Sequence, residues 1–460
     1  MTETLKSAAA QIAEWGTSPP ALPDSVRHVA HRALIDTVGV TLGGGEEPAP
    51  RMLASRTLRQ AAEGPSTLMT GDGHIVPASA ALVNGTAAHA LDFDDVSGAY
   101  DGHPSCPVLP AAVAAAEARG ASGEDLLVAY ALGIETASAV GAALGRENYS
   151  RGFHTTSVVG VIGAAVSAGL IYELDEAALR RALGIAASCA SGLKKNFGTM
   201  TKPLHAGLAA RAGVEAAELA ADGFTADEDV FSGKIGMLAV FGASERLADL
   251  LPEDGTGREW LVVSPGISLK KYPCCYMLAR ALDGVLALKE EGLNPEQVRG
   301  VEVVVQPGGV SAVIHDRPKT GLEGKFSVPY TVAAALVDGE IKLATFTDDA
   351  VMRPEVRSLM DRIEYREAPD ADDEGGKGFS VVERGYARVR IFTRSGEERE
   401  VFVRTPRGAP GEPFTREEVD AKFLDAAGSA MGRDGASALL DRLWRLSEIR
   451  DVTEVFRDVV

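Results

Sequence analysis

The run VVGVIGAAVSAGLIY at residues 158–172 is the most apolar stretch of the chain. It is too short to cross a bilayer, which takes about 20 apolar residues. Its continuous apolar character predicts a helix that is buried on most sides. It belongs to a series of segments rich in alanine and glycine, which we expect to form closely packed helices: residues 26–38, 109–119, 125–144, 156–174, 176–190 and 204–221.

The second half of the chain changes character near residue 260. Residues 301–305 are short and β-branched, and residues 386–392 and 400–404 alternate around Ser395-Gly396, which predicts strands and a hairpin. Residues 275–289 and 328–337 interrupt the strands as predicted helices, so this region is expected to be a small α+β domain.

The tail returns to helix, with a capping box at Thr415 and Glu418 and an amphipathic segment at 438–449. A helical tail after an α+β insert predicts that the last segment packs back on the first domain. We therefore expect a mainly α protein, with an all-helical domain from residues 1–265 and 408–460 and a smaller α+β domain from residues 266–407.

The bulk composition narrows the class of partner. The net charge of -19 argues against a nucleic-acid partner and against docking on an anionic membrane. The four cysteines, at positions 106, 189, 274 and 275, form no CxxC pair, which fits a reducing cytoplasm better than a disulfide framework or a zinc site. The N-terminus lacks the pattern of a signal peptide. We therefore expect a cytoplasmic protein with a small-molecule partner.

The first segment with chemical character runs from His89 to Ser105. Three aspartates, at positions 92, 94 and 95, lie close to His89 and His103. A loop of small residues can hold a carboxylate and an imidazole together for acid–base work. The alternative is that Asp94 and Asp95 cap a turn, since aspartate is a common turn residue. His103, between a glycine and a proline, is better explained by function.

Two further segments open predicted helices. His154 lies just before the helix predicted around the apolar run, where a helix N-terminus would lower its pKa and let it act as a base. Thr155 or Thr156 as a helix cap is the alternative, but it leaves the histidine unexplained. Lys202 starts another helix among small residues, which makes an anion site. A snorkelling surface lysine is the alternative for Lys202, and a core histidine for His205.

The α+β region holds weaker candidates. Lys270 and Lys271 precede a Tyr-Pro-Cys-Cys stretch, and either lysine could hold a carboxylate, or both could simply be solvated. Tyr330 follows Ser327, a predicted helix cap, and could point into a cleft. The chain has no GxGxxG after a strand, no P-loop, no HExxH and no GxSxG, so no nucleotide or zinc-protease site is indicated.

These five segments, in this order and spacing, resemble the MmgE/PrpD family, which includes 2-methylcitrate dehydratase, cis-aconitate decarboxylase and iminodisuccinate epimerase. The resemblance implies a large helical domain from both chain ends, a smaller α+β lid, an active site between them and a homodimer without metal or organic cofactor. It assigns the catalytic positions to Asp92, His103, His154 and Lys202. The substrate-binding positions would be Lys270, Lys271, Tyr330 and Asp95.

Two positions depart from the family pattern. Relatives often carry a histidine at or near Ala279, and some carry a threonine where this chain has Val96. One acid–base or substrate contact is therefore missing or replaced, which puts a standard family substrate in doubt.

The resemblance and the local chemistry together predict a lyase acting on a small di- or tricarboxylic acid, by dehydration of the 2-methylcitrate dehydratase kind. The lysines would hold carboxylates and stabilise enolate-like charge, while His103 and His154 would move protons. Asp92 would orient one imidazole. Epimerisation of an amino-dicarboxylate and decarboxylation of the cis-aconitate type remain alternatives, and a non-catalytic binding protein is a remote one.

Overall fold

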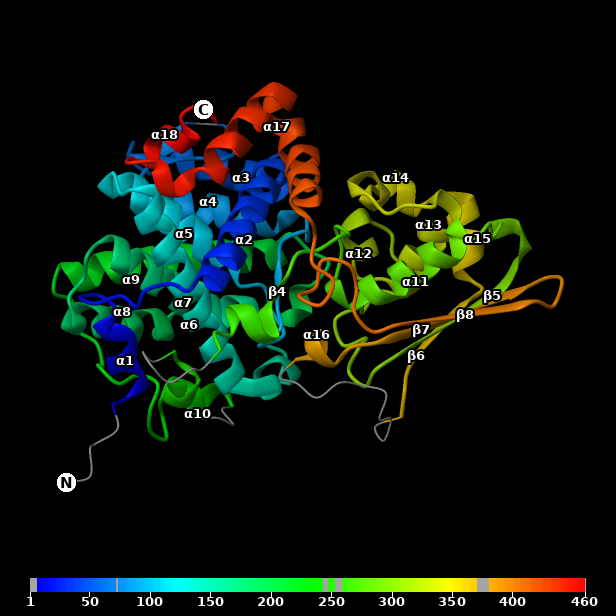
Figure 1. Ribbon diagram of the computed structural model, residues 1–460, viewed down its shortest axis with the longest axis horizontal. Coiled ribbons are helices and arrows are strands. Elements are labelled where there is room, and N and C mark those ends of the chain that lie inside the picture. The colour runs from blue at the N-terminus through cyan, green and yellow to red at the C-terminus, as the bar shows by residue number, and fades with distance from the viewer. Residues whose placement is uncertain (1–5, 72, 243–246, 253–258, 370–379, 460) are drawn as a thin grey trace. The chain divides into compact units, whose positions relative to one another are not determined.

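A computed structural model describes residues 6–71, 73–242, 247–252, 259–369 and 380–459 (Figure 1). Its contacts divide the chain into two compact units. Unit 1 comprises Met1–Lys194, Met200–Ile267 and Thr415–Val460, and unit 2 comprises Lys195–Thr199 and Ser268–Phe414. The boundaries expected from the sequence lay at residues 265 and 408, and they did not anticipate that residues 195–199 belong with unit 2.

Unit 1 is built almost wholly from helices, because its segments are rich in alanine and other good helix formers. Its helices are α1 (Ala8–Glu14), α2 (Asp24–Gly44), α3 (Pro48–Leu58), α4 (Pro77–Ala90), α5 (Ser105–Arg119), α6 (Gly123–Ser150), α7 (Thr155–Ile171), α8 (Glu176–Ser188), α9 (Thr201–Ala221), α10 (Met237–Phe241), α17 (Arg416–Trp444) and α18 (Thr453–Phe456).

Unit 1 is not all-helical, which corrects the prediction. The strand β1 (Ser66–Thr67) pairs with β2 (His74–Ile75), and β3 (Val96–Ser97) and β4 (Ile267–Ser268) are equally short. The predicted helix at 125–144 runs on as α6 to Ser150, across a kink at Gly145 with φ +62°. Within the described residues α6 is the one helix long and apolar enough to cross a membrane, but 94% of its most apolar stretch is buried inside the protein.

Glycine residues allow close packing of α4 against α9 and of α6 against α7. At Gly85 of α4, an added Cβ would lie 2.9 Å from the Cα of Gly207 in α9. Gly133 of α6 and Gly163 of α7 meet in the same way. A Cβ added to either glycine would lie within 2.7 Å of the other glycine's carbonyl oxygen. The expected close packing of small-residue helices is therefore present, and it brings helix backbones into direct contact.

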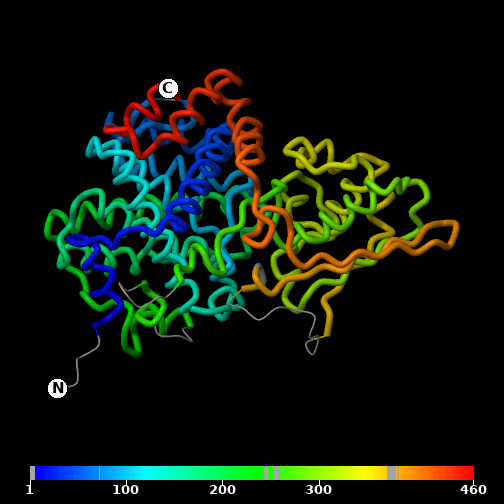
Figure 2. The backbone as a smooth tube through the Cα atoms, in the orientation of Figure 1, coloured from blue at the N-terminus to red at the C-terminus, as the bar shows by residue number. Residues whose placement is uncertain are grey.

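The long helix α17, near the C-terminus, packs on α2, and these two helices run side by side in the tube view (Figure 2). The capping box predicted at Thr415 and Glu418 starts α17. Lys422 of α17 forms a buried ion pair with Asp36 of α2 (Nζ–Oδ1 2.7 Å) and donates to the carbonyl of Phe93 at 2.8 Å. The tail thus reaches the loop that follows α4.

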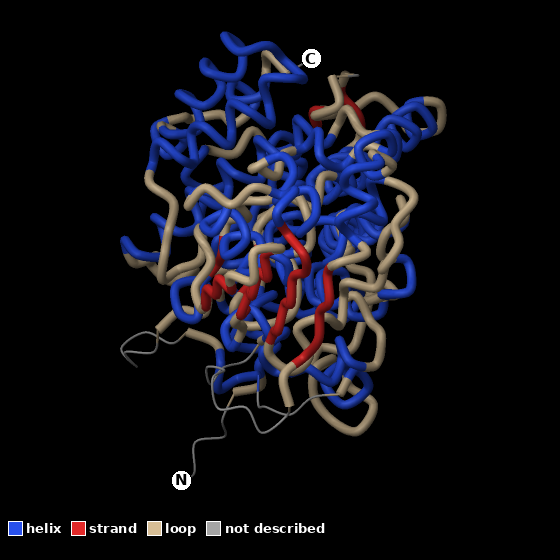
Figure 3. Tube along the Cα trace, turned by 90° about the vertical axis from the view of Figure 1, so that its right-hand side faces the viewer, coloured by secondary structure: helices blue, strands red, loops and turns tan. Residues whose placement is uncertain are grey.

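Unit 2 contains a four-stranded sheet in the order β6-β5-β7-β8, whose strands Figure 3 draws in red. Strands β5 (Val298–Val305) and β6 (Ile363–Glu367) are parallel, while β7 (Ala387–Thr393) is antiparallel to both β5 and β8 (Glu398–Val403). The hairpin predicted around Gly396 (φ +89°) joins β7 to β8, but β6 was missed.

The helices of unit 2 cover this sheet. Helix α11 (Ala279–Glu290) contacts β7 and β8, and α13 (Val328–Asp338) contacts β6. The shorter helices are α12 (Gly321–Gly324), α14 (Asp348–Val351), α15 (Pro354–Met360) and α16 (Val381–Arg384). The helix predicted from residue 275 starts later, after a 3₁₀ turn at Tyr276–Leu278.

Candidate active site

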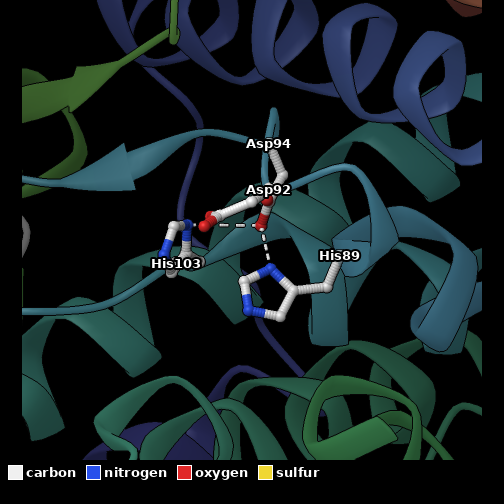
Figure 4. Close-up of side chains that lie close together, drawn as sticks. All are labelled: His89, Asp92, Asp94 and His103. Atoms are coloured by element: carbon white, nitrogen blue, oxygen red, sulfur yellow. Dashed lines mark hydrogen bonds and ion pairs between the residues drawn. The ribbon is translucent and has the colours of Figure 1, made fainter. Parts of the chain in front are cut away.

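A cluster of buried titratable side chains lies where three elements of unit 1 meet. His89 sits in the last turn of α4, and the loop that follows carries Asp92, Asp94 and His103 (Figure 4). His154 precedes α7, while Lys202 and His205 lie in the first turns of α9. The structure therefore brings together all four residues that the sequence proposed as catalytic.

Asp94 lies between two imidazoles. Its Oδ2 is 2.8 Å from His89 Nδ1 and 3.3 Å from His103 Nδ1, as the dashed lines of Figure 4 show. His103 Nδ1 is also 2.8 Å from the carbonyl oxygen of Asp95. Burial alone would raise the pKa of Asp94, but the two histidines lower it well below its usual value. Asp94 is therefore an ionised acceptor for both rings.

Lys202 fixes the tautomer of His89. Its Nζ is 2.9 Å from His89 Nε2 and 3.2 Å from Asp92 Oδ1. An ammonium can donate but not accept, so His89 accepts at Nε2 and donates its Nδ1–H to Asp94. Burial is the main cause that lowers the pKa of His89 to about 3, so the ring is neutral. The orienting role expected of Asp92 therefore falls to Asp94, and Asp92 pairs with Lys202.

His154 and His205 form a second pair beside this network. Their Nδ1 atoms are 3.1 Å apart, and the His154 ring stacks on that of His89 with centroids 5.6 Å apart. Burial, followed by the nearby charge of Lys202, lowers the pKa of His154 well below its usual value and that of His205 to about 4. Lys202 is thus the positive charge among neutral imidazoles, which suits an anionic ligand.

Asp95 does not face the same network. It is fully buried, its Oδ1 accepts the Ser105 N–H at 3.2 Å, and its Oδ2 bonds the Ser105 hydroxyl. That hydroxyl also contacts Tyr130. Burial raises the pKa of Asp95 to about 8. These contacts favour a role in which Asp95 secures the start of α5, over its predicted role as a substrate ligand.

The candidates of unit 2 have different environments. Lys270 is buried, whereas the Lys271 ammonium lies near the surface and pairs with Asp283 at 3.2 Å. Tyr330 is fully buried and donates its hydroxyl to the carbonyl of Thr345, so it serves the core of unit 2. Lys270 is therefore the stronger substrate-binding candidate among these three.

The cluster also has the composition of a metal site. Ligand atoms of His89, Asp92, Asp94 and His103 all lie within 4.8 Å of one another. However, both Nδ1 atoms already face Asp94, and the Lys202 ammonium contacts both His89 Nε2 and Asp92. A protonated lysine in this position competes with a metal ion, so the donor set fits an internal hydrogen-bond network better than metal coordination.

The sequence prediction left His89, Asp94 and His205 out of the catalytic set. A signal existed for two of them, because His89 and His205 are the single histidines of two alanine-rich helices, α4 and α9. Asp94 could not be separated from Asp95 by sequence, since neighbouring residues of a loop can point in opposite directions. Packing of α4, α7 and α9 decides which of these side chains meet.

Comparison with known proteins covers both units. The MmgE/PrpD N-terminal domain model matches residues 10–249, and the MmgE/PrpD C-terminal domain model matches residues 272–446. Mouse and human cis-aconitate decarboxylases are each 28% identical, over 95% and 94% of this chain and 89% of each relative. Cis-aconitate decarboxylase of Aspergillus terreus is 26% identical over 96% of this chain and 94% of its own length.

Proposed function

We propose that this chain, which belongs to the MmgE/PrpD family, is a lyase. Its reaction would be the decarboxylation of a small unsaturated tricarboxylic acid of the cis-aconitate type. The relatives described above are named as cis-aconitate decarboxylases, and each aligns over nearly its whole length. They favour decarboxylation, which the sequence left as an alternative, over the dehydration that it favoured.

The observation that carries the proposal is the arrangement around Lys202. Its ammonium is buried, is held in place by Asp92 and His89, and lies close enough to the neutral imidazoles of His154 and His205 to lower their pKa values. A substrate carboxylate would be attracted to this cation and would accept hydrogen bonds from imidazole N–H groups beside it. A polyanion would therefore enter a site whose cation is already positioned before binding.

The chemistry needs one proton donor. Breaking the bond between carbon and the departing carboxylate releases CO₂ and leaves its electron pair delocalised over the unsaturated acid. A proton must then be added to carbon, so the trianion and one proton become a dianion and CO₂. His103 and His154 are the proposed donors, and bound negative charge would raise the lowered pKa of His154 toward neutrality. Positioned acids of this kind contribute roughly 10²- to 10⁴-fold.

The substrate need not be cis-aconitate itself. Val96 and Ala279, where some relatives carry polar side chains, are both buried here. We propose that the substrate either places an apolar substituent against Val96 or is a shorter acid that does not reach it. Lys270 remains proposed as a residue that binds a substrate carboxylate.

Incubation with unsaturated, hydroxy and amino di- and tricarboxylates in D₂O, followed by NMR, tests the proposal. The expected result is CO₂ release with one deuterium on product carbon, abolished in His103→Ala and Lys202→Met and retained in Lys271→Met. Release or uptake of water without CO₂ would instead establish dehydration. Deuterium exchange with neither would establish epimerisation, and both results would overturn decarboxylation.

A further inference from the structure

We propose that His205 is a positioning residue that sets the tautomer of His154 and passes it a proton during each turnover. The proton-transfer part rests on the proposed decarboxylation, whereas the tautomer part concerns the free protein. His205 is assigned by its contact with the His154 ring.

The contact defines a shared proton. The two Nδ1 atoms, 3.1 Å apart, are at hydrogen-bond distance, and two neutral imidazoles can bond there only if one donates and the other accepts. One ring therefore carries its proton on Nδ1 and the other on Nε2. If His205 donates, His154 holds its proton on Nε2, where it is an acid; if His154 donates, its Nε2 is a base.

This coupling of the two histidines would supply the proton that decarboxylation consumes. His154 would give its Nε2 proton to the substrate carbon while its Nδ1 takes the Nδ1 proton of His205. A proton from bulk solvent, taken up as hydronium and delivered through water, would add to His205 Nε2 as its Nδ1–H bond breaks, so that no hydroxide is left behind. The outcome is two neutral rings with exchanged tautomers and one solvent proton on the product, so protons balance. Return of both rings to the starting tautomers completes the cycle.

Neighbouring groups are poorly suited to this relay. Lys202, His89 and His103 are the charged or titratable groups that influence His154 besides His205. His89 is held at Nδ1 by Asp94 and at Nε2 by Lys202, so it cannot hand a proton across its ring. His103 directs Nδ1 to Asp94 and to the Asp95 carbonyl.

Hydrogen bonds to the backbone hold His154 and His205 in position. Ser157, in the first turn of α7, donates its hydroxyl to the carbonyl of His205 at 3.0 Å. The His154 N–H donates to the carbonyl of Gly192, whose φ of +113° suits glycine. A Cβ at Gly192 would lie 3.4 Å from both His154 Cβ and His205 Cγ, so this segment closes over the pair.

The test combines chemical rescue with NMR. His205→Ala should lower kcat by about 10²-fold with little change in KM, because the acid is no longer resupplied. Imidazole and 4-methylimidazole should restore activity, whereas pyrazole, a similar but much weaker base, should not. His205→Asn keeps a hydrogen-bonding amide near the Nδ1 position but cannot relay a proton, so KM should stay normal while kcat stays low.

Tautomers are read in the free protein from long-range ¹H–¹⁵N correlations, independently of any substrate. The wild type should show opposite tautomers for His154 and His205, and His205→Ala should change that of His154. An unchanged His154 tautomer, or a kcat within threefold of wild type in both variants, would overturn the proposal. If the wild type decarboxylates none of the acids tested, the NMR result still decides the tautomer part, and the proposed function fails separately.

Discussion

At the scale of single residues, the neighbouring aspartates Asp94 and Asp95 have opposite surroundings. Asp94 is an ionised acceptor for His89 and His103, whereas Asp95 is bonded to Ser105. Asp94→Asn should lower kcat by about 10²- to 10⁴-fold, because an amide that donates cannot hold both rings in their present tautomers. Asp95→Asn is the matched control and should stay within about threefold of wild type in steady-state assays. Equal losses in both variants would contradict this division.

Asp95 should also make stability depend on pH. Its pKa is about 8 in the folded protein and about 4 in the unfolded chain, so its favourable contribution is full below pH 4 and is lost as pH rises through 8. Asp95→Asn mimics the protonated acid without titrating. The free energy of unfolding of wild type minus that of the variant should therefore fall between pH 5 and 8, by at most ~1.4 kcal/mol per pH unit.

Urea unfolding of both proteins at several pH values measures this difference. Their other titrating groups are the same, so those contributions largely cancel. A difference that stays constant or rises with pH would show that Asp95 is already ionised in the folded protein.

Sequence reasoning found His103, His154 and Lys202 because each sits in a small-residue turn or at a helix start, where packing does not explain it. It proposed Asp92 as the residue that orients an imidazole, whereas Asp94 is the aspartate whose Oδ2 contacts both His89 and His103. The turn at Asp92 has φ +51°, and this left-handed residue decides the direction of the side chains that follow. No local pattern encodes that choice, since several residue types tolerate it.

At the scale of elements, contact between α4 and α9 depends on glycine. A Cβ at Gly207 would lie 2.2 Å from the carbonyl oxygen of Leu82 and 2.3 Å from the hydroxyl of Thr86. Gly207→Ala should destabilise the protein by about 1–3 kcal/mol and lower kcat, because α9 carries Lys202. Gly428→Ala in α17 has nothing within 4 Å and should stabilise by about 0.5–1 kcal/mol. Thermal or urea unfolding of both variants tests the contrast, which a loss in Gly428→Ala would contradict.

Helix α17 contributes Lys422, which pairs with Asp36 and contacts the loop that carries Asp92 and Asp94. Lys422→Met leaves Asp36 buried without that partner, which typically costs about 3–5 kcal/mol. It also releases the Phe93 carbonyl, which lies between Asp92 and Asp94, so kcat should fall even where the protein is folded. The double variant Lys422→Met/Asp36→Leu removes both charges and should recover most of the stability but not kcat. Recovery of both would show that Phe93 needs no anchor.

Most helices could be predicted from alanine content and apolar periodicity, because these patterns depend directly on which residues are buried. Strand β6 was not predicted although its five residues alternate between more buried and exposed positions, because so short a run is recognised as a strand only by its pairing with β5. The full length of α6 was not predicted, because a glycine such as Gly145 commonly ends a helix, whereas here it forms a kink. Short strands and kinks are decided by tertiary contacts that one sequence does not display.

At the scale of the whole molecule, the expected homodimer has a candidate surface on α9. Leu208 and Leu219 are 41% and 39% exposed, and their spacing of eleven residues puts them on one face of the helix. Phe224, just beyond the helix, is 58% exposed. Exposed apolar side chains gathered on one element mark an association surface more often than scattered ones do.

Light scattering after size-exclusion chromatography should therefore give the mass of two chains for the wild type. Leu208→Glu/Leu219→Glu should give the mass of one, because a self-complementary C₂ interface would place these charges on both partners and leave them desolvated. Met52→Glu, which changes an exposed apolar side chain on α3, should leave the dimer intact. If the dimer survives the double substitution and circular dichroism shows an unchanged fold, the interface does not lie on α9.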